Sequence, residues 1–351
     1  MARRHEASRR RESRGRQRGQ GVVVPMTLPP LSPELLALVL AALVLDLWLG
    51  DPRWLPHPVV GMGRLIGALE ARLNRGRPQA RRAKGVVLTL VVVGLAWTLA
   101  TLAIGLAGVV SPWLALVVEG LLLWTCLACR GLVQAARAVA TPLARGDLYQ
   151  ARRAVSAIVG RDTRELDEAG VSRACVESVA ENTVDGITAP LFWALLGGAP
   201  LALAYKAANT LDSMVGHRND RYREFGWASA RFDDLVNLLP ARLTALAMWC
   251  LAAVVPGLRR RGAWSATCRQ APAHPSPNAG WPEAMVANLL GVELGGVNHY
   301  GDQISDRARL GSPTETLTAR HIDAAIRCLY AGTAGVLTLL ALIILVLEAV
   351  R

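Results

Sequence analysis

Lysine is almost absent from this sequence. Arginine supplies nearly all of the 39 basic side chains, and the two lysines are Lys84 and Lys206. Such a bias indicates an arginine-rich coding background, in which a lysine inside a polar motif stands out. Lys206 lies in such a motif and is therefore a candidate for binding an anionic group such as a phosphate.

Cysteine is present, but without the pattern of a metal centre or a disulfide framework. The six cysteines are scattered, and Cys126 and Cys129 alone have the spacing of a metal or redox pair. That pair lies inside an apolar run with no second Cys or His pair, so the two side chains are expected to pack as small hydrophobic groups. We predict neither zinc nor disulfides.

The sequence also lacks internal repeats, strand-like alternation of polar and apolar residues, and a P-loop lysine motif. The first absence argues against a transporter built from two matching halves. The second argues against a sheet. The third leaves open how a nucleotide would be held.

Long apolar runs, in contrast, are abundant. About 20 apolar residues cross ~30 Å of hydrocarbon as a helix, and such spans are predicted near 31–49, 85–110, 112–129 and 331–350. Two further apolar segments, 187–205 and 243–258, are irregular. The predicted fold class is an all-α, polytopic integral membrane protein with amphipathic cytoplasmic helices and re-entrant segments, built as a single membrane-embedded domain over 27–351.

The first 26 residues are set apart from that domain. They are arginine-rich and polar and have no apolar periodicity, which predicts a disordered tail. Either this tail is a solvated extension, or translation starts at Met26 and the tail is not made. Binding to nucleic acid is the more specific alternative. Tails of such a composition are more often simply solvated, so no nucleic-acid partner is predicted.

Basic residues predict the orientation of the spans, because they favour the cytoplasmic side of a membrane. Six of them lie within 72–84, just before one span, and Arg130, Arg137 and Arg145 follow the next. The region 85–128 is therefore predicted to be a hairpin with both ends in the cytoplasm. The amphipathic stretch 130–188 is predicted to be cytoplasmic as well.

The apolar segment 187–205 is interrupted by Pro190, by the pair Gly197 and Gly198, and by Pro200. Because these residues break helices, we expect a re-entrant or half-buried helical hairpin there and not a simple span. A full span would place the polar motifs before and after it on opposite sides of the membrane.

Three carboxylates precede that segment at helical spacing. In a helix, Glu177, Glu181 and Asp185 share one face, with Asn182 beside them. Like charges so close repel one another unless a cation or a basic group stands among them. Magnesium is the natural ion for carboxylates and substrate phosphates, whereas the alternative is a solvated acidic stripe paired with Arg173.

A second polar block follows the apolar segment, and basic residues such as Arg218 and Arg221 come directly after it. Arginine and lysine suit phosphate oxygens, and a carboxylate suits a metal. The alternative for the arginines is snorkelling at the membrane interface. The members of the block recur at three-to-four spacing and so project to one side of a helix: they are Lys206, Asn209, Asp212 and Ser213.

Two later segments complete the polar set. Asp233 and Asp234 form either a second acidic point for a metal or an amine, or the cap at the start of a helix. The proline-punctuated loop 276–283 leads into a predicted helix, and its amides could receive an anion at the helix N-terminus. Asn278 and Glu283 belong to this loop, for which the alternative is a plain structural turn.

Several of these motifs occur in a family-like order from about Leu35 to the C-terminus. The stretches are DLWLGDPRWLPHPVVGMGRLI, IVGRDTREL, ESVAENTVDGITAPLFW, YKAANTLDSMVGHRNDRYREFGWASARFDDLVNLLPARLTAL and SPNAGWPEAMVANLLGVELGG. Together they resemble the CobD/CbiB family of cobalamin biosynthesis. Several independent motifs of that length make the resemblance specific.

The resemblance implies an adenosylcobinamide-phosphate synthase, an ATP-dependent ligase that joins a carboxylate of adenosylcobyric acid to the amine of aminopropanol phosphate or a related amino alcohol. Forming an amide from an unactivated carboxylate is uphill in water, so ATP as co-substrate and Mg²⁺ are expected. The implied location is the inner (plasma) membrane, with several spans and a cytoplasmic active site. Beside the lipid bilayer, other late cobalamin-pathway enzymes are candidate partners.

This interpretation assigns roles to the polar residues. The predicted catalytic residues are Glu181, Asp185, Asp212 and Asp234. The predicted substrate-binding residues are Lys206, Asn209, Ser213, Arg218, Arg221, Asn182, Asn278 and Glu283. The predicted metal ligands are Glu177, Glu181 and Asp212. The alternatives are a magnesium-dependent intramembrane phosphotransferase or prenyltransferase, whose Asp-rich motifs are not found here, and a transporter.

Overall fold

The computed structural model describes residues 28–52, 57–300 and 303–350, so the predicted tail 1–26 lies outside the described residues. The N-terminal helices are α2 (Pro33–Leu49), α3 (Pro58–Leu73), α4 (Pro78–Val110), α5 (Pro112–Trp124), α6 (Cys129–Ala144) and α7 (Leu148–Val155). The central helices are α8 (Glu168–Thr183), the π-helical turn η1 (Val184–Thr188), α9 (Ala189–Val215), α10 (Trp227–Val236) and α11 (Leu238–Leu251). The C-terminal elements are α12 (Ala263–Gln270), the 3₁₀ turn η2 (Ala271–Ala273), α13 (Gly280–Leu290), β1 (Leu294–Tyr300), β2 (Gln303–Leu310) and α14 (Ala319–Val350).

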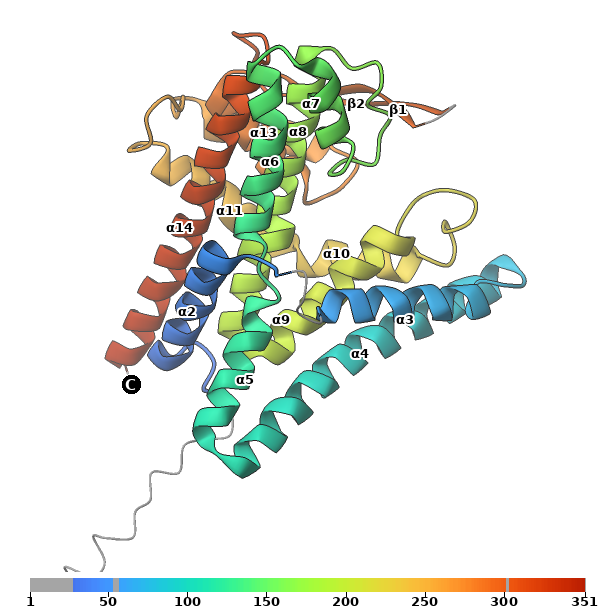
Figure 1. The fold of residues 1–351 in the computed structure, drawn as a ribbon, viewed down its shortest axis with the longest axis vertical. Coiled ribbons are helices and arrows are strands. Elements are labelled where there is room, and N and C mark those ends of the chain that lie inside the picture. Colours follow the sequence, from blue (N-terminus) through green and yellow to red (C-terminus); the bar gives the residue numbers. More distant parts are fainter. Residues whose placement is uncertain (1–27, 53–56, 301–302, 351) are drawn as a thin grey trace, which may run out of the picture.

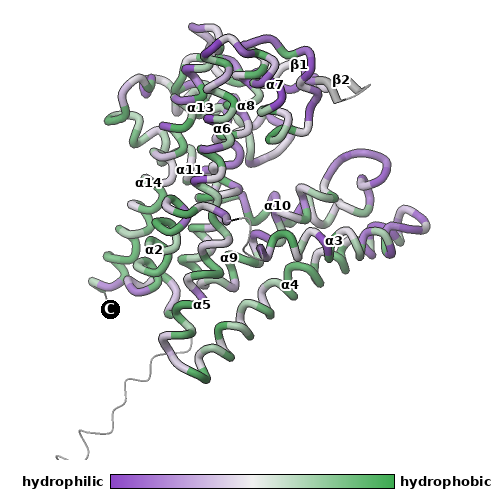
Figure 2. The backbone as a smooth tube through the Cα atoms, viewed as in Figure 1, coloured by the Kyte–Doolittle hydropathy of each residue, from purple (hydrophilic) through white to green (hydrophobic). Residues whose placement is uncertain are grey.

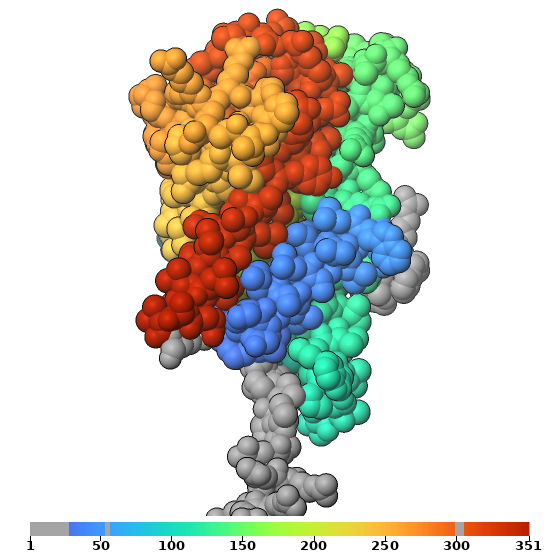
Figure 3. All heavy atoms as spheres, turned by 90° about the vertical axis from the view of Figure 1, so that its left-hand side faces the viewer, coloured from blue at the N-terminus to red at the C-terminus, as the bar shows by residue number. Residues whose placement is uncertain are grey.

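The molecule has an apolar lower half and a polar upper half. Figures 1 and 2 show α2, α5, much of α9 and the lower part of α14 in the hydrophobic half, and α7, α13 and the strands in the hydrophilic half. Figure 3 shows α2 and the lower part of α14 side by side on one face. Their outward side chains are mostly apolar, as a bilayer requires.

Several helical stretches of the described chain are long and apolar enough to cross a membrane: Pro78–Val110, Pro112–Ala144, Glu168–Val215 and Ala319–Val350. The pair α10 and α11 qualifies as a further stretch, bent by 43°. The prediction of an all-α, polytopic membrane protein is therefore confirmed. The predicted segment 31–49 coincides with α2, whose 17 residues make it shorter than these four.

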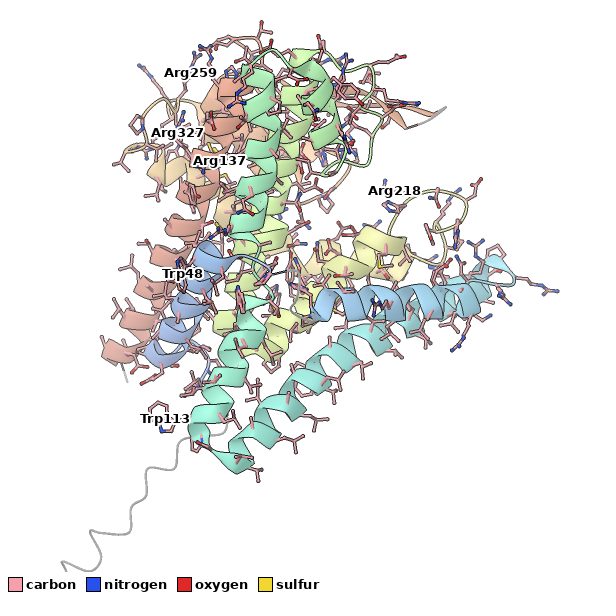
Figure 4. All side chains as sticks on the ribbon, viewed as in Figure 1. Trp48, Trp113, Arg137, Arg218, Arg259 and Arg327 are labelled. Atoms are coloured by element: carbon pink, nitrogen blue, oxygen red, sulfur yellow. The ribbon has the colours of Figure 1, made fainter. Side chains whose placement is uncertain are left out.

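The helices α4 and α5 form the predicted hairpin, which turns at Ser111. The Ser111 hydroxyl accepts a hydrogen bond from the Trp113 amide at 3.2 Å, and Pro112 occupies the first turn of α5, so the turn both ends one helix and starts the next. Figure 4 places Trp113 at the lower tip of this hairpin and Trp48 at the upper end of α2. Both indoles are largely exposed, as in the aromatic belts that border a bilayer.

The predicted re-entrant segment is the region around α9. This helix is interrupted at Gly197 and Gly198, which have non-helical backbone angles. The chain reverses there, because the Asn209 amide, after the break, donates a hydrogen bond at 3.1 Å to Asp185, before it. The two arms of α9 therefore form a helical hairpin, as predicted. The polar residues that follow the break lie beside those that precede it.

A two-stranded antiparallel hairpin, β1 and β2, corrects the expectation that no sheet is present. Its pairing is irregular between Leu294 and Gly296, where Gly295 and Gly296 have positive φ. These glycines hide the alternation from which a strand is inferred. Arg173 fastens β1 to α8 by donating to the carbonyls of Gly295 and Val297 at 2.7 and 3.0 Å.

Candidate functional site

A cavity of about 280 Å³ opens where the polar half meets the apolar half, and carboxylates gather in it. Its walls come from α8, η1, the end of α9, α10, α11, the loop before α13, and β2. The sequence separation between these walls is large, but each brings polar side chains to the same space. The five carboxylates that line it are Glu181, Asp185, Asp212, Asp233 and Asp234.

The hairpin of α9 brings the first two predicted acidic blocks together. Glu181 and Asp185 come from the chain before the break, and Asp212 comes from the last turn after it. Asn209 is fixed by its hydrogen bond to Asp185 and thereby joins the two arms. The sequence predicted each set on its own helix face, and the reversal at the glycines places them across one cavity.

Gly216 makes room for the Asp212 side chain. A Cβ at Gly216 would lie 1.9 Å from the Asp212 Oδ1, so any larger residue must push the carboxylate aside. We expect Gly216→Ala to lower the rate of the ligation that the family resemblance implies at least about tenfold while the protein still folds, because misplacing a reacting group is costly. Activity and melting temperature in detergent should be compared with Gly131→Ala, since a Cβ at Gly131 meets nothing within 4 Å. Equal activities of the two variants would contradict the assigned position of Asp212.

The opposite wall is a chain of hydrogen bonds that the sequence analysis did not identify. The Tyr205 hydroxyl donates to Asn237 Oδ1 at 2.9 Å, and the Asn237 amide donates to Asp233 Oδ2 at 3.1 Å. The other oxygen of Asp233, Oδ1, is buried without a hydrogen-bond partner. An unpaired buried carboxylate oxygen is costly unless a ligand satisfies it. Asp233 was a candidate from the sequence, but Tyr205 lies on a different helix, and spacing along the chain does not show that the two belong to one hydrogen-bonded chain.

Basic groups face the carboxylates across the cavity. Arg218 follows α9, and Arg307 projects from β2, so the cavity combines negative walls with two guanidinium groups. Figure 4 shows Arg218 on the loop beyond α9. Arg231 forms an ion pair with Asp234 at 3.5 Å. Arg307 was missed because its strand was not predicted.

The proline-punctuated loop closes the cavity from the side of α13. The side-chain amide of Asn278 donates to the Asp234 carbonyl at 2.7 Å, which ties the loop to α10. The hydroxyl of Ser276 accepts from the backbone amides of Asn278 and Ala279 at 3.2 Å each. These two amides, which the sequence suggested for an anion, are therefore already engaged within the loop.

His274 and Glu283 face each other behind this loop, with 3.7 Å between His274 Nε2 and the nearest Glu283 oxygen. Burial raises the pKa of Glu283 well above its usual range, and the nearby charges of Glu181 and Glu177 act in the same direction. Burial also lowers the pKa of His274. Both shifts favour the neutral forms. His274 Nδ1 lies 3.0 Å from the Ser276 amide nitrogen, from which it accepts in one tautomer, and 3.2 Å from the Ser276 carbonyl oxygen, to which it donates in the other.

The lowered pKa of His274 predicts a loss of stability in weak acid. Below the usual value of 6.5, the unfolded chain takes up a proton that the folded chain resists, so the free energy of unfolding falls as pH decreases toward the folded-state pKa. We expect His274→Gln to flatten this part of the profile. Melting temperatures measured in detergent between pH 7.5 and 5 would check it, and an unchanged slope in the variant would contradict a buried neutral histidine.

Other predicted site residues lie outside the cavity wall. Glu177 binds the guanidinium of Arg161 and accepts the Gly295 amide at 2.7 Å. Asn182 donates to the Ser178 carbonyl of its own helix at 2.9 Å, and Ser213 donates to the Asn209 carbonyl at 2.9 Å. Arg221 holds Glu70 of α3 through two hydrogen bonds of 3.1 and 2.9 Å. Glu283 is buried behind the wall.

Lys206 lies on the second arm of α9 and does not line the cavity wall. It is half-buried, and its charge interacts with that of Asp185. A larger groove of about 810 Å³ lies elsewhere, between the start of α8 and the segment after β2, and contains none of the predicted site residues. The assignments of individual roles stay predictions.

The chemistry of the cavity suits a magnesium ion. Among the described residues, no three His, Cys, Asp or Glu side chains stand close enough to hold a metal by themselves. Mg²⁺ does not need such a cage, because it keeps several waters and binds through one or two carboxylates together with substrate phosphates. Asp212 and Asp234, which line the same cavity, fit this requirement, and the unpartnered Oδ1 of Asp233 is a further oxygen for a hydrated ion.

Comparison with known proteins identifies the family. The model of the family described as CobD/Cbib protein matches residues 39–329. The chain belongs to the CobD/CbiB family. It is 49% identical over 305 residues to the "Cobalamin biosynthesis protein CobD" of Halalkalibacterium halodurans, an alignment that covers 87% of this chain and 95% of the relative.

Two further members of the family show the same extent of similarity. The protein of that name from Geobacter metallireducens is 52% identical over 305 residues, covering 87% of this chain and 95% of the relative. The "Cobalamin biosynthesis protein CbiB" of Salmonella typhimurium is 45% identical over 304 residues, covering 85% and 94%. The search of solved structures found no match. The cavity lies within the segment that the CobD/CbiB model matches.

Proposed function

We propose that this protein acts in cobalamin biosynthesis as an adenosylcobinamide-phosphate synthase. It would join a corrin side-chain carboxylate of adenosylcobyric acid to the amine of aminopropanol phosphate, or of a related amino alcohol, with consumption of ATP. Membership of the CobD/CbiB family supports the pathway. The observation that carries the reaction is the cavity in which five carboxylates face two arginines, because ligation of a carboxylate requires both a held phosphate and a place for the amine proton.

The positions of the residues in the cavity support a role for each of them in this reaction. Asp212 and Asp234 would hold Mg²⁺, which when bound neutralises charge on the phosphates of ATP. Arg218 and Arg307 would bind phosphate oxygens of the substrates. Asp185, held by Asn209 on the cavity wall, would accept the proton that the amine loses as it attacks the activated carboxylate.

The cytoplasmic face of the inner membrane is the proposed location of the site. Arg137, Arg259 and Arg327 lie one above another in the polar half (Figure 4), on the same side of the apolar half as the cavity. Arginine-rich surfaces favour the cytoplasmic side. ATP and a water-soluble corrinoid are also available there.

Reconstitution tests this function. Purified protein in detergent should convert adenosylcobyric acid, amino-alcohol phosphate and Mg·ATP into a product whose mass equals that of the corrinoid plus the amino-alcohol phosphate minus water. Omission of ATP should abolish the product. A protein that instead transfers a phosphoryl or prenyl group to lipid, or only moves the corrinoid across a vesicle membrane, would show that the assignment is wrong.

A further inference from the structure

The break in α9 exposes backbone groups in the apolar half of the protein. Gly197 has φ −170° and ψ 32°, and Gly198 has φ 64°, so helical hydrogen bonding stops at this pair. The last carbonyls of the first arm and the first amides of the second arm lose their partners within the helix. In a bilayer, water cannot satisfy them, so other parts of the protein must.

Two distant segments satisfy groups on either side of the break. The Leu31 amide donates to the Leu195 carbonyl at 2.9 Å. Glu119 Oε1 accepts the amide of Ala199, the residue that begins the second arm, at 3.3 Å. Glu119 is 3% exposed and lies in the middle of α5, an otherwise apolar helix. An ionisable side chain in such a position is costly and is typically retained for a function.

The fit between Glu119 and the break is close. A Cβ at Gly198 would lie 2.2 Å from Glu119 Oε1, and the positive φ of Gly198 favours glycine independently. The carboxyl group therefore occupies the space that the missing side chain leaves. The contact also joins α5 directly to the start of the arm that carries Asn209 and Asp212.

We propose that Glu119 is a positioning residue for the active site. By accepting the first amide of the second arm, it fixes where that arm starts and how it is directed. It thereby fixes where Asn209 meets Asp185 and where Asp212 stands in the cavity, ten and more residues later. The effect on activity rests on the proposed ligase function. The effect on the position of the arm does not.

Two substitutions at Glu119 distinguish the role of its hydrogen-bond acceptor from the role of its charge. Glu119→Gln keeps a carbonyl oxygen at the same place, and Glu119→Met keeps the volume without an acceptor. We expect Glu119→Met to lower kcat about tenfold or more with little change in KM, because reacting groups are displaced while the substrates still bind. Glu119→Gln should stay within about threefold of the wild type. Leu329→Ala, a buried substitution on α14, controls for loss of stability alone and should lower the melting temperature without this change in kcat.

The position of the second arm of α9 can be measured without an activity assay. Spin labels at Leu121→Cys and Met214→Cys, two exposed positions on α5 and on the second arm, report their separation in a background that lacks the six native cysteines. We expect one narrow distance distribution for the wild type and for Glu119→Gln, and a shifted or broadened one for Glu119→Met. An unchanged distribution in Glu119→Met would overturn the proposal, as would a changed distribution with unchanged kcat. An inactive wild type would instead count against the ligase function, while the distances would still decide the role of Glu119.

Discussion

Asp212→Asn is expected to abolish amide formation while the protein still inserts and folds. The amide keeps the shape of the side chain and the space at Gly216 but loses the charge that would hold a cation beside Asp234. We expect kcat to fall by at least about 100-fold, which corresponds to ~2.7 kcal/mol of transition-state stabilisation. The measurement is ligase activity at saturating substrates and at several magnesium concentrations.

The control for this variant is Glu168→Gln. Glu168 is an exposed carboxylate in the first turn of α8, the helix that carries Glu181 lower down. Its neutralisation should leave kcat within about twofold of the wild-type value, since Glu168 does not line the cavity. Activity of Asp212→Asn close to that of the wild type at ordinary magnesium would remove Asp212 from the site.

Glu177→Gln is expected to cost stability more than catalysis. The Glu177 carboxylate and the Arg161 guanidinium form an ion pair in which both side chains are less than a tenth exposed. Removing one charge leaves the other buried without its counter-ion, which costs ~3–5 kcal/mol. Replacing both residues together, as Arg161→Met with Glu177→Met, should recover much of that loss. Thermal unfolding of the wild type, Arg161→Met, Glu177→Met and the double variant, the four proteins of one double-mutant cycle, gives the coupling energy.

The exposed pair of Arg164 and Asp162 serves as the control. Asp162→Asn should change the melting temperature little, because water screens an exposed ion pair. If Glu177→Gln melted like the wild type but required much more magnesium, Glu177 would be a metal ligand, as the sequence suggested, and the structural role inferred from its ion pair would be wrong.

The sequence allowed the re-entrant hairpin to be predicted because its cause is local. Pro190, Gly197, Gly198 and Pro200 act on their own backbone, so their effect on a helix can be inferred without any partner. The helix faces that carry Glu181 with Asp185, and Asn209 with Asp212, could be predicted for the same reason, since residues three to four apart share a face of a helix. Whether the two faces meet depends on the angle at the break, which no spacing encodes.

The contacts that could not be predicted join residues far apart in the chain. Tyr205 with Asn237, Arg161 with Glu177, and Glu119 with Ala199 each depend on packing between separate elements. The strands were missed because glycines at Gly295 and Gly296 hide their alternation, and Arg307 was missed with them. Arg221, which its spacing suits to a phosphate, pairs in the structure with Glu70 of a separate helix, and no spacing indicates that contact.

Isotope transfer tests the central claim most directly. If the protein activates the corrinoid carboxylate by phosphorylation before the amine attacks, adenosylcobyric acid labelled with ¹⁸O in both carboxylate oxygens must lose one label in the reaction. Mass spectrometry should then find one ¹⁸O in the new amide and one in the inorganic phosphate, at a one-to-one ratio with product, and neither with Asp212→Asn. Phosphate released without ¹⁸O would contradict activation by phosphorylation, and a corrinoid that keeps both labels while ATP is consumed would contradict an ATP-dependent ligase.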